Sequence, residues 1–561
     1  MPRPSSAPSP LPRPGSGDWL QLAASLLWLG QAAALATAVQ GMADGASFAR
    51  GAGCAAAVLA LGLLRAALDA AGARSSFRRA RRHLGELRAQ ALSALSGSSP
   101  LDPGRPAAGE AASVLAEQAD AALPYLSRYP AVQLKVSIVP LAIVAAVLPL
   151  SWVAALVLLV AAPLIPVFMA LVGWRAQRAS QEHLAEMGGM NAFLLDRLRG
   201  LATLRALDAV QATARRIDDV AQNLRTRTMA VLRIAFLSSA VLELFSAIGV
   251  AMVAVYVGFH LLGQVPVGTW GTPLSLGQGL FILLLAPAFF EPLRELSAVW
   301  HDRASGQAAL QALAALRAPA LCLPGTHARP ASGATVHAAA PAIAMHAVDF
   351  RYGPEHAEAL RRFDLAVAPG EHVAIVGPSG AGKSTVLALI AGLAPAQGGR
   401  ICIGGTELTD DTAATLRTRM AWIGQRAHVF AGTLRANVAL GRGMSPAAID
   451  AALRAATLDH LADDPAGRSL GESGTGLAGG EILRLALARA AASPDCDVWL
   501  ADEPTAHLDA ATARELTRRL LALAAGKTLV VATHDPELAA CMDRVVPIGA
   551  GVEACAQERC V

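Results

Sequence analysis

One stretch decides the fold of this chain: Gly377-Pro378-Ser379-Gly380-Ala381-Gly382-Lys383-Ser384-Thr385. It matches the phosphate-binding pattern G-x-x-x-x-G-K-S, between an apolar β-type run (371–376) and an apolar helical run (386–391). Its glycines let backbone N–H groups surround a polyphosphate, and the helix N-terminus that follows adds positive potential. We therefore expect a nucleoside triphosphate here, with Lys383 at its β- and γ-phosphates and Ser384 on Mg²⁺.

Two later apolar runs end in side chains that suit the same site. The run 498–501 ends in Asp502 and Glu503, and the run 528–533 ends in His534. We expect Asp502 to hold Mg²⁺, Glu503 to polarise the attacking water and His534 to contact the γ-phosphate. The alternatives are two solvated acids at a strand end and a structural histidine.

Composition indicates a membrane protein rather than a soluble enzyme. Of 561 residues, 54% are hydrophobic, and the mean hydropathy is +0.43. Charged residues make up 16%, well below the usual quarter. Long apolar runs, at 19–43, 51–71, 136–174 and 234–290, have room for six membrane spans, the third and fourth runs holding two each.

The arginines indicate the orientation of these spans. They gather in two long polar stretches and in the C-terminal half, while the loops near Asp44 and Gln264 carry almost none. The positive-inside rule then places both termini in the cytosol. We interpret the polar stretches as cytosolic extensions of membrane helices, and we expect a lipid membrane, and no nucleic acid, as a partner.

These patterns predict an all-α six-helix transmembrane domain followed by an α/β P-loop ATPase domain. We expect a disordered tail at 1–17, rich in Pro, Ser and Gly, and the transmembrane domain at 18–317. A linker rich in Ala, Pro and Gly follows at 318–342. The remaining residues, 343–561, alternate β-type and helical runs, as a P-loop α/β domain does.

Residues 343–548 resemble the ATPase domains of ABC transporters, and the whole chain resembles half of a type IV ABC exporter. The resemblance implies that Tyr352 stacks on the adenine of ATP and that Gln425 senses Mg²⁺, the water and the membrane domain. It also implies that Asp509 lies in the loop that crosses to a partner's site. Short coupling helices are expected near 97–112 and 199–206. The segment Leu477-Ala478-Gly479-Gly480-Glu481 stands where the family signature L-S-G-G-Q belongs.

Two signature positions depart from the family pattern. In the family, each ATP lies between one P-loop and the signature of the other ATPase domain. Ala478 lacks the serine hydroxyl, and Glu481 brings a negative charge toward a polyphosphate. We therefore expect functional asymmetry and a heterodimer; the alternative is that the backbone contacts of Gly479 and Gly480 suffice.

Within the membrane half, the segments 163–174, 229–245 and 283–287 resemble the CydD subunits of CydDC-type heterodimeric exporters. The resemblance implies export of cysteine- or glutathione-type thiols across the inner membrane to the periplasm, a CydC-like partner and support of cytochrome bd assembly. It leaves open another cargo, such as haem, lipid or a drug. A different class of function, a membrane-anchored regulatory ATPase that moves no solute, also stays open.

One acid is a candidate substrate residue. Glu243 lies in an apolar span, where an ionisable side chain is costly and marks function by default. It is predicted to pair with a substrate ammonium or, alternatively, with a polar group on a neighbouring helix. Arg65 and Asp69 lie one turn apart and are expected to pair on one helix face. Arg65 and Lys135 are placed either to draw in a carboxylate or to snorkel. His260 is an alternative ligand for haem iron.

Overall fold

The computed structural model describes residues 13–45, 47–163, 194, 197, 200–317, 321–326, 340–425, 427–462, 469–471, 477–493, 495–506 and 508–549. It divides into two compact units. The first comprises Met1–Gln90 and Ala108–Ala315, and the second comprises Ala91–Ala107 and Leu316–Val561. We call them the helical unit and the nucleotide unit.

The helical unit is built from long apolar helices. Five are long and apolar enough to cross a membrane, among the residues that the structure describes, and a shorter apolar helix spans Trp152–Pro163. The rest of the fourth expected span, from residue 164, lies outside the described residues. The helices of this part of the chain are α1 (Ser16–Ala43), α2 (Phe48–Ser96), α3 (Ala108–Ala116), η1 (Gln118–Ala121), α4 (Ala122–Val147), α6 (Leu201–Ala206), α7 (Val210–Leu261) and α8 (Leu276–Ala315).

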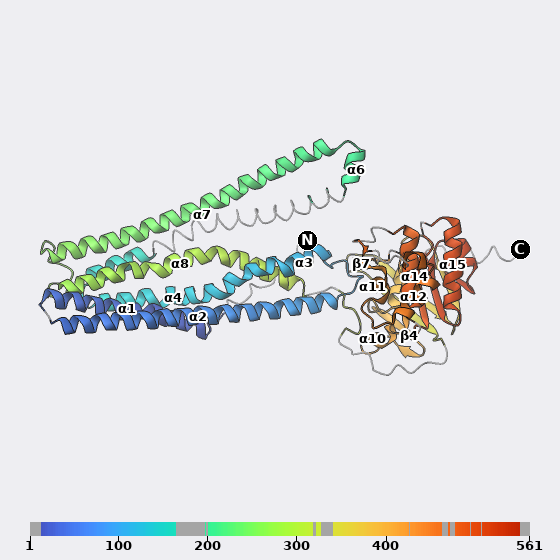
Figure 1. Cartoon of the computed structure of the whole chain (residues 1–561), viewed down its shortest axis with the longest axis horizontal. Coiled ribbons are helices and arrows are strands. Elements are labelled where there is room, and N and C mark those ends of the chain that lie inside the picture. Colours follow the sequence, from blue (N-terminus) through green and yellow to red (C-terminus); the bar gives the residue numbers. More distant parts are fainter. Residues whose placement is uncertain are drawn as a thin grey trace. The chain divides into compact units, whose positions relative to one another are not determined.

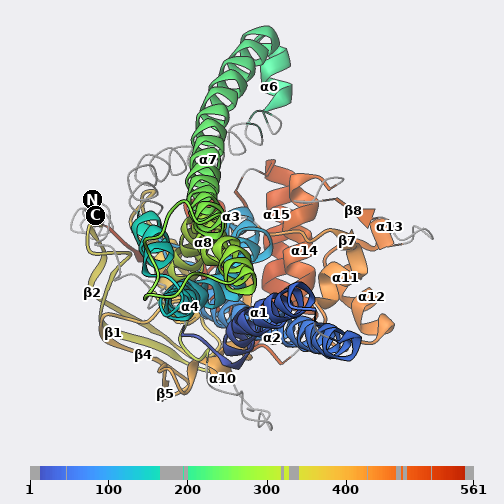
Figure 2. The ribbon, with the colours of Figure 1, turned by 90° about the vertical axis from the view of Figure 1, so that its left-hand side faces the viewer.

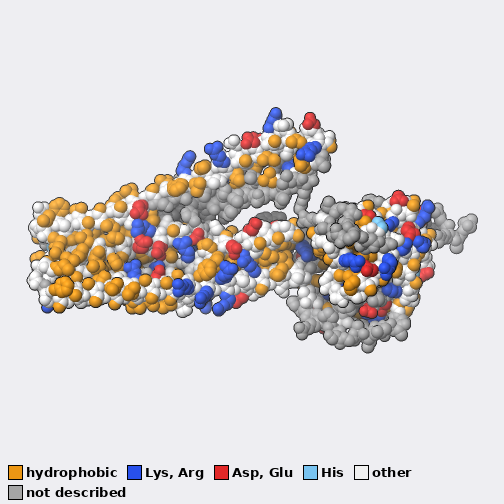
Figure 3. Space-filling model, in the orientation of Figure 1, with side chains coloured by type: hydrophobic (Ala, Val, Ile, Leu, Met, Phe, Trp, Pro, Cys, Tyr) orange, Lys and Arg blue, Asp and Glu red, His pale blue; other side chains and the backbone are white. Residues whose placement is uncertain are grey.

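Two of these helices are long enough to extend beyond a membrane. The 49 residues of α2 and the 52 residues of α7 are continuous helices (Figure 1). At 1.5 Å per residue each is roughly 75 Å long, more than twice the hydrocarbon thickness of a bilayer. On the face shown in Figure 3, hydrophobic side chains cover the end where α7 turns into α8, and charged side chains gather toward the other end of the unit.

The expected coupling helices are only partly present. α6 is a short helix at the second position, but residues 97–107 of the first contain no helix, and α3 begins only at Ala108. Residues 97–107 belong to the nucleotide unit and are bonded within it: Ser99 N donates to Leu321 O at 2.9 Å, and Ser99 Oγ donates to Leu393 O at 2.6 Å. These bonds hold the segment in extended and turn conformations.

A buried carboxylate fixes the start of α1 against α2. Asp18 is fully buried. Its Oδ1 accepts from Ser76 Oγ at 2.6 Å, and its Oδ2 accepts from Arg79 Nη2 at 2.6 Å and from Gly15 N at 2.8 Å. The three bonds compensate the cost of burying this charge.

The nucleotide unit contains two main sheets. A parallel sheet has the order β11-β3-β10-β9-β6, and an antiparallel sheet has the order β2-β1-β4-β5. Figure 2 shows the antiparallel sheet and helices α11 to α14 on opposite sides of the unit. The strands are β1 (Ile343–Arg351), β2 (Glu358–Val367), β3 (His372–Val376), β4 (Gly398–Ile403), β5 (Thr406–Glu407), β6 (Met420–Ile423), β7 (Gly432–Thr433), β8 (Ser469–Leu470), β9 (Val498–Asp502), β10 (Thr528–Thr533) and β11 (Arg544–Pro547).

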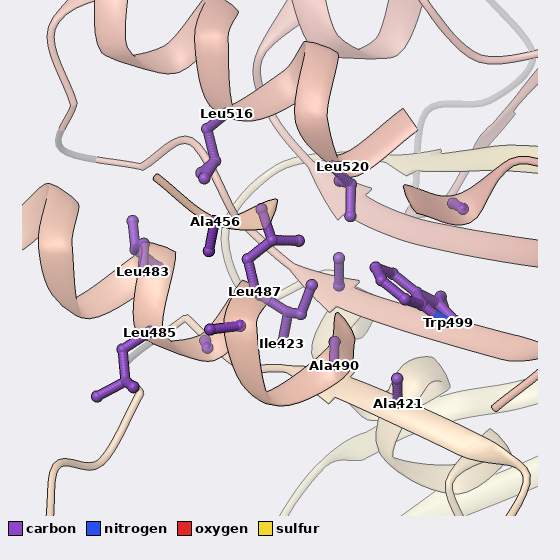
Figure 4. Close-up of a cluster of buried hydrophobic side chains, with 14 of the residues drawn as sticks. Ala421, Ile423, Ala456, Leu483, Leu485, Leu487, Ala490, Trp499, Leu516 and Leu520 are labelled. Atoms are coloured by element: carbon purple, nitrogen blue, oxygen red, sulfur yellow. The ribbon is translucent and has the colours of Figure 1, made fainter. Parts of the chain in front are cut away.

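Helices cover the parallel sheet and close its core. Trp499 of β9 is buried among side chains of α14 and α15, including Leu487 and Leu520 (Figure 4). Every residue of β9 and β10 is buried, as central strands of a covered parallel sheet require. The helices are α9 (Lys383–Ile390), α10 (Ala413–Arg417), α11 (Leu434–Ala439), α12 (Pro446–Ala455), α13 (Asp459–Ala462), α14 (Gly479–Ala491), α15 (Ala510–Ala524) and α16 (Pro536–Ala540).

Candidate ATP site

The parallel sheet brings the predicted catalytic residues to one edge. In the register of β10, Thr533 lies beside Val376 of β3 and Ala532 lies beside Asp502 of β9. The carboxyl ends of neighbouring parallel strands meet at the same edge, so the loops that follow them converge there. The P-loop, Asp502 with Glu503, and His534 therefore form one site.

The P-loop has the backbone that a phosphate cradle needs. Gly380 and Gly382 have φ of 83° and 99°, values that side-chain-bearing residues rarely adopt. A Cβ on Gly377 would lie 2.2 Å from Ile548 O, so the loop also needs a glycine for close packing. Lys383 is 6% exposed, and its Nζ donates to Gly377 O at 2.8 Å and to Pro378 O at 3.1 Å. The Lys383 ammonium group is therefore bound by backbone carbonyl groups of the P-loop itself.

Ser384 and Asp502 form the pair that fits a magnesium ion. Ser384 Oγ donates to Asp502 Oδ1 at 3.0 Å, and Asp502 is 7% exposed. Burial raises the pKa of the Asp502 carboxyl, Ser384 lowers it through the hydrogen bond, and the neighbouring Glu503 charge raises it again. A cation would relieve this carboxylate, and hydroxyl and carboxylate oxygens are the ligands that Mg²⁺ prefers.

Glu503 occupies the centre of the site in an unusual backbone conformation. Its φ is 47°, while its backbone N–H still donates to Ala532 O at 2.9 Å. A left-handed non-glycine residue costs of order 1–3 kcal/mol, and such residues gather at functional sites. The turn places Glu503 Oε2 3.0 Å from His534 Nδ1 and Oε1 3.9 Å from Lys383 Nζ. The carboxylate is therefore held between the two groups expected at the γ-phosphate.

A side-chain hydrogen bond that the sequence did not predict joins the two loops on either side of Glu503. Thr505 Oγ1 donates to Asp535 Oδ2 at 2.9 Å, and Asp535 also caps α16. The bond ties the loop after β9 to the loop that carries His534. The sequence signal was available, because Asp535-Pro536 has the form of a helix start with proline at its first position.

The family resemblance placed three further residues around the nucleotide: Tyr352, Gln425 and Asp509. Tyr352 follows β1, and its hydroxyl lies 2.7 Å from Thr385 Oγ1, so its ring lies close to the start of α9. Gln425 is exposed just after β6. Asp509 caps α15, accepting from Ala511 N at 3.1 Å and Thr512 N at 3.0 Å. The Thr512 side chain and these backbone bonds lower the pKa of its carboxyl. Their roles toward ATP and a partner stay predictions.

The signature segment forms the N-terminus of α14, and the carboxylate of Glu481, in the first turn, caps this end of the helix. Glu481 Oε2 accepts from Ala478 N at 2.7 Å, and Glu481 Oε1 lies 3.6 Å from His460 Nε2. This is the glutamate half of a capping box, with the serine half absent. The Glu481 carboxylate therefore occupies the helix N-terminus, the position at which an α-helix favours a bound anion.

In the helical unit, the structure gives Glu243 a protein partner. Its Oε1 and Oε2 lie 3.2 and 3.3 Å from Arg294 Nη1 on α8, and Arg294 also pairs with Glu291. This contact corresponds to the alternative expectation that Glu243 pairs with a polar group on a neighbouring helix. A substrate role for Glu243 stays a prediction. His260 is buried, and its Nε2 accepts from Leu274 N at 3.3 Å, which occupies one ring nitrogen.

The fold and the site define a membrane-embedded ABC ATPase. A model of the ABC transporter transmembrane region matches residues 24–283, and a model of the ABC transporter domain matches residues 360–506. A solved bacterial Atm1-family ABC exporter with ATP bound has the same fold, with a TM-score of 0.74 at 22% identity over 94% of this chain and 93% of that one. The chain belongs to the ABC transporter family, as an exporter half with a transmembrane and an ATPase domain.

Within this family the chain is similar to CydD and CydC proteins. It is 37% identical over 440 residues to the glutathione/L-cysteine transport system ATP-binding/permease protein CydD of Escherichia coli (strain K12), covering 77% of this chain and 73% of that protein. It is 30% identical over 433 residues to the CydC protein of the same-named system in Bacillus subtilis (strain 168), covering 76% and 73%. The chain is therefore a multi-pass inner-membrane ATPase that couples ATP hydrolysis to transport.

Proposed function

We propose that this chain is one half of a heterodimeric exporter that moves glutathione- or cysteine-type thiols from the cytoplasm to the periplasm. The cargo rests on the printed names of the similar CydD and CydC proteins. The partner is a CydC-like half, both termini are cytoplasmic, and Mg²⁺ accompanies ATP on Ser384, Asp502 and Gln425. A role in cytochrome bd assembly rests on the family resemblance.

One observation supports the heterodimer more than any other: the contrast between the two ATP-binding surfaces of this chain. On the P-loop side, Glu503 lies near both Lys383 and His534, and Ser384 is hydrogen-bonded to Asp502. The signature side lacks a hydroxyl at 478 and carries a self-capping carboxylate at 481. A homodimer would place this altered signature over both ATP molecules, whereas a heterodimer lets a partner supply an ordinary signature to the complete P-loop site.

Transport into sealed vesicles tests the function. Inverted membrane vesicles that contain this chain and a co-expressed CydC-like half expose their cytoplasmic face. ATP, Mg²⁺ and labelled glutathione or cysteine are added outside the vesicles, and uptake of the thiol into the lumen is followed. We expect uptake that stops when Glu503 is changed to Gln in this chain. ATP hydrolysis without uptake of either thiol would contradict the cargo, and uptake of haem in its place would favour the alternative cargo.

A further inference from the structure

The helical unit contains a charged cavity that the ATP site does not use. It has a volume of about 780 Å³ and lies between α1, α2, α4 and α8. Its apolar wall includes Trp28, Ile143 and Leu284. Its other wall carries side chains of both charges and one amide, namely Gln31, Arg65, Asp69, Lys135, Glu291 and Glu295.

Most of these charges are already paired within the protein. Lys135 Nζ lies 3.4 Å from Glu295 Oε2, and Glu291 pairs with Arg294. The first pair links α4 to α8, and the second lies within α8, so both belong to the wall of the cavity. The two remaining charged side chains of the cavity, Arg65 and Asp69, both lie on α2.

Arg65 and Asp69 do not form the ion pair that their spacing suggested. Among the described residues neither has an oppositely charged group within 4.0 Å; the Arg65 guanidinium instead lies 5.1 Å from the centre of the Trp28 ring. Residues four apart on a helix share a face, with Cβ atoms about 5–6 Å apart. The cavity therefore presents a separated cation and anion side by side.

Such charges are costly in a membrane helix unless they face water or a ligand. A planar guanidinium held against an aromatic ring keeps its N–H groups free for a carboxylate. A lone carboxylate nearby accepts hydrogen bonds from an ammonium group. A cation and an anion on one helix face suit a molecule that carries both charges close together.

We propose that this cavity binds the amino-acid end of a zwitterionic peptide cargo, with its carboxylate on Arg65 and its ammonium on Asp69. The inference rests on the proposed function and deepens it, since glutathione carries such an end. The cavity volume falls within the range of ligand pockets, about 300–1,000 Å³. None of its described lining residues is a cysteine or a histidine. Recognition is therefore directed at the zwitterion and not at the thiol.

Equilibrium binding to the assembled transporter tests this assignment. The complex with a CydC-like half is placed in lipid nanodiscs without ATP, and three ligands are titrated: glutathione, S-methylglutathione and glutathione lacking its amino group. Wild type should bind the first two within about twofold of each other, and the deaminated ligand at least about tenfold more weakly, since a charge-assisted hydrogen bond is lost.

Two variants separate the charges. Asp69→Asn should weaken glutathione at least about tenfold, because the ammonium loses its partner. The same variant should leave the deaminated ligand unchanged, because that ligand has no ammonium to lose. Arg65→Gln should weaken all three ligands. Arg78→Gln, an exposed arginine further along α2, is the matched control and should change nothing. Thermal unfolding of each complex shows whether a variant still folds, and Arg65→Lys provides a second, milder test of the same charge.

The outcomes distinguish the cavity from the exporter. If both variants bind glutathione as wild type does, or if S-methylglutathione is rejected, the zwitterion site is overturned while thiol export stands. If the wild type transports no thiol, the proposed function fails, and binding of S-methylglutathione still decides for or against the cavity.

Discussion

Restoring the family signature should increase ATP turnover at one site of the assembled transporter. In the double variant Ala478→Ser/Glu481→Gln, serine returns a hydroxyl at the cap of α14. Glutamine removes the charge but keeps an amide oxygen that can accept from the 478 backbone N–H, now 2.7 Å from Glu481 Oε2. The helix N-terminus then offers its donors to the γ-phosphate without a competing anion.

The magnitude follows from the charge and the hydrogen bond. A carboxylate about 4 Å from one phosphate charge costs about 4 kcal/mol at an effective dielectric constant of about 20. A hydrogen bond from serine to the phosphate adds about 1.5–3 kcal/mol. Screening and relaxation reduce the sum, but 1.4 kcal/mol already corresponds to a factor of ten in affinity. We expect ATP affinity at this site to rise at least about tenfold.

The assay is ATPase activity and ATP affinity of the complex with a CydC-like half. Glu481→Gln alone separates the charge from the hydroxyl, and Glu407→Gln, an exposed acid on β5, is the matched control. Unchanged activity and affinity in the double variant would refute the reasoning, and would show that the backbone contacts of the signature suffice.

Three further predictions concern the site and the fold. Glu503→Gln should lower ATPase activity at least about a hundredfold while equilibrium ATP binding persists, because the group that polarises water is lost; equal losses of binding and turnover would contradict this role. Burial raises the pKa of Asp502, so protons should compete with Mg²⁺ at a higher pH than for an ordinary aspartate. The apparent Mg²⁺ affinity for the ATP complex should therefore fall on acidification from above the usual aspartate range, and a flat profile down to that range would contradict it. Asp18→Ala removes the acceptor of Ser76 Oγ and Gly15 N and leaves Arg79, whose side chain is 36% exposed, without its partner. It should cost about 1–3 kcal/mol in thermal unfolding, with Arg78→Gln as the neutral control.

The ATP site was predictable because its motifs are local. Strand, loop and helix around Lys383 follow each other in the chain, and the strand ends at Asp502 and His534 must meet at one edge of a parallel sheet. The long helices α2 and α7 followed equally from uncharged runs that continue into arginine-rich stretches. The run 136–174, predicted to hold two spans, is divided by a turn at 148–150 between α4 and the helix Trp152–Pro163.

Pairing between helices was not predictable from one sequence. Nothing near Glu243 indicates that Arg294, on the next long helix, lies within 3.2 Å of it. The i,i+4 spacing of Arg65 and Asp69 suggested an ion pair, but the Trp28 ring on α1 holds the guanidinium instead. Such contacts depend on how helices are rotated against each other, which packing decides. The Glu481 cap, by contrast, was visible three residues after Ala478 and was missed.

The first measurement is ATPase activity of the purified chain, alone and with a co-expressed CydC-like half, with and without glutathione or cysteine. We predict that activity requires the partner and rises when either thiol is added, as a heterodimeric thiol exporter with one altered signature should behave. Full activity of the chain alone, unaffected by thiols, would contradict both the asymmetry of the two ATP sites and the cargo.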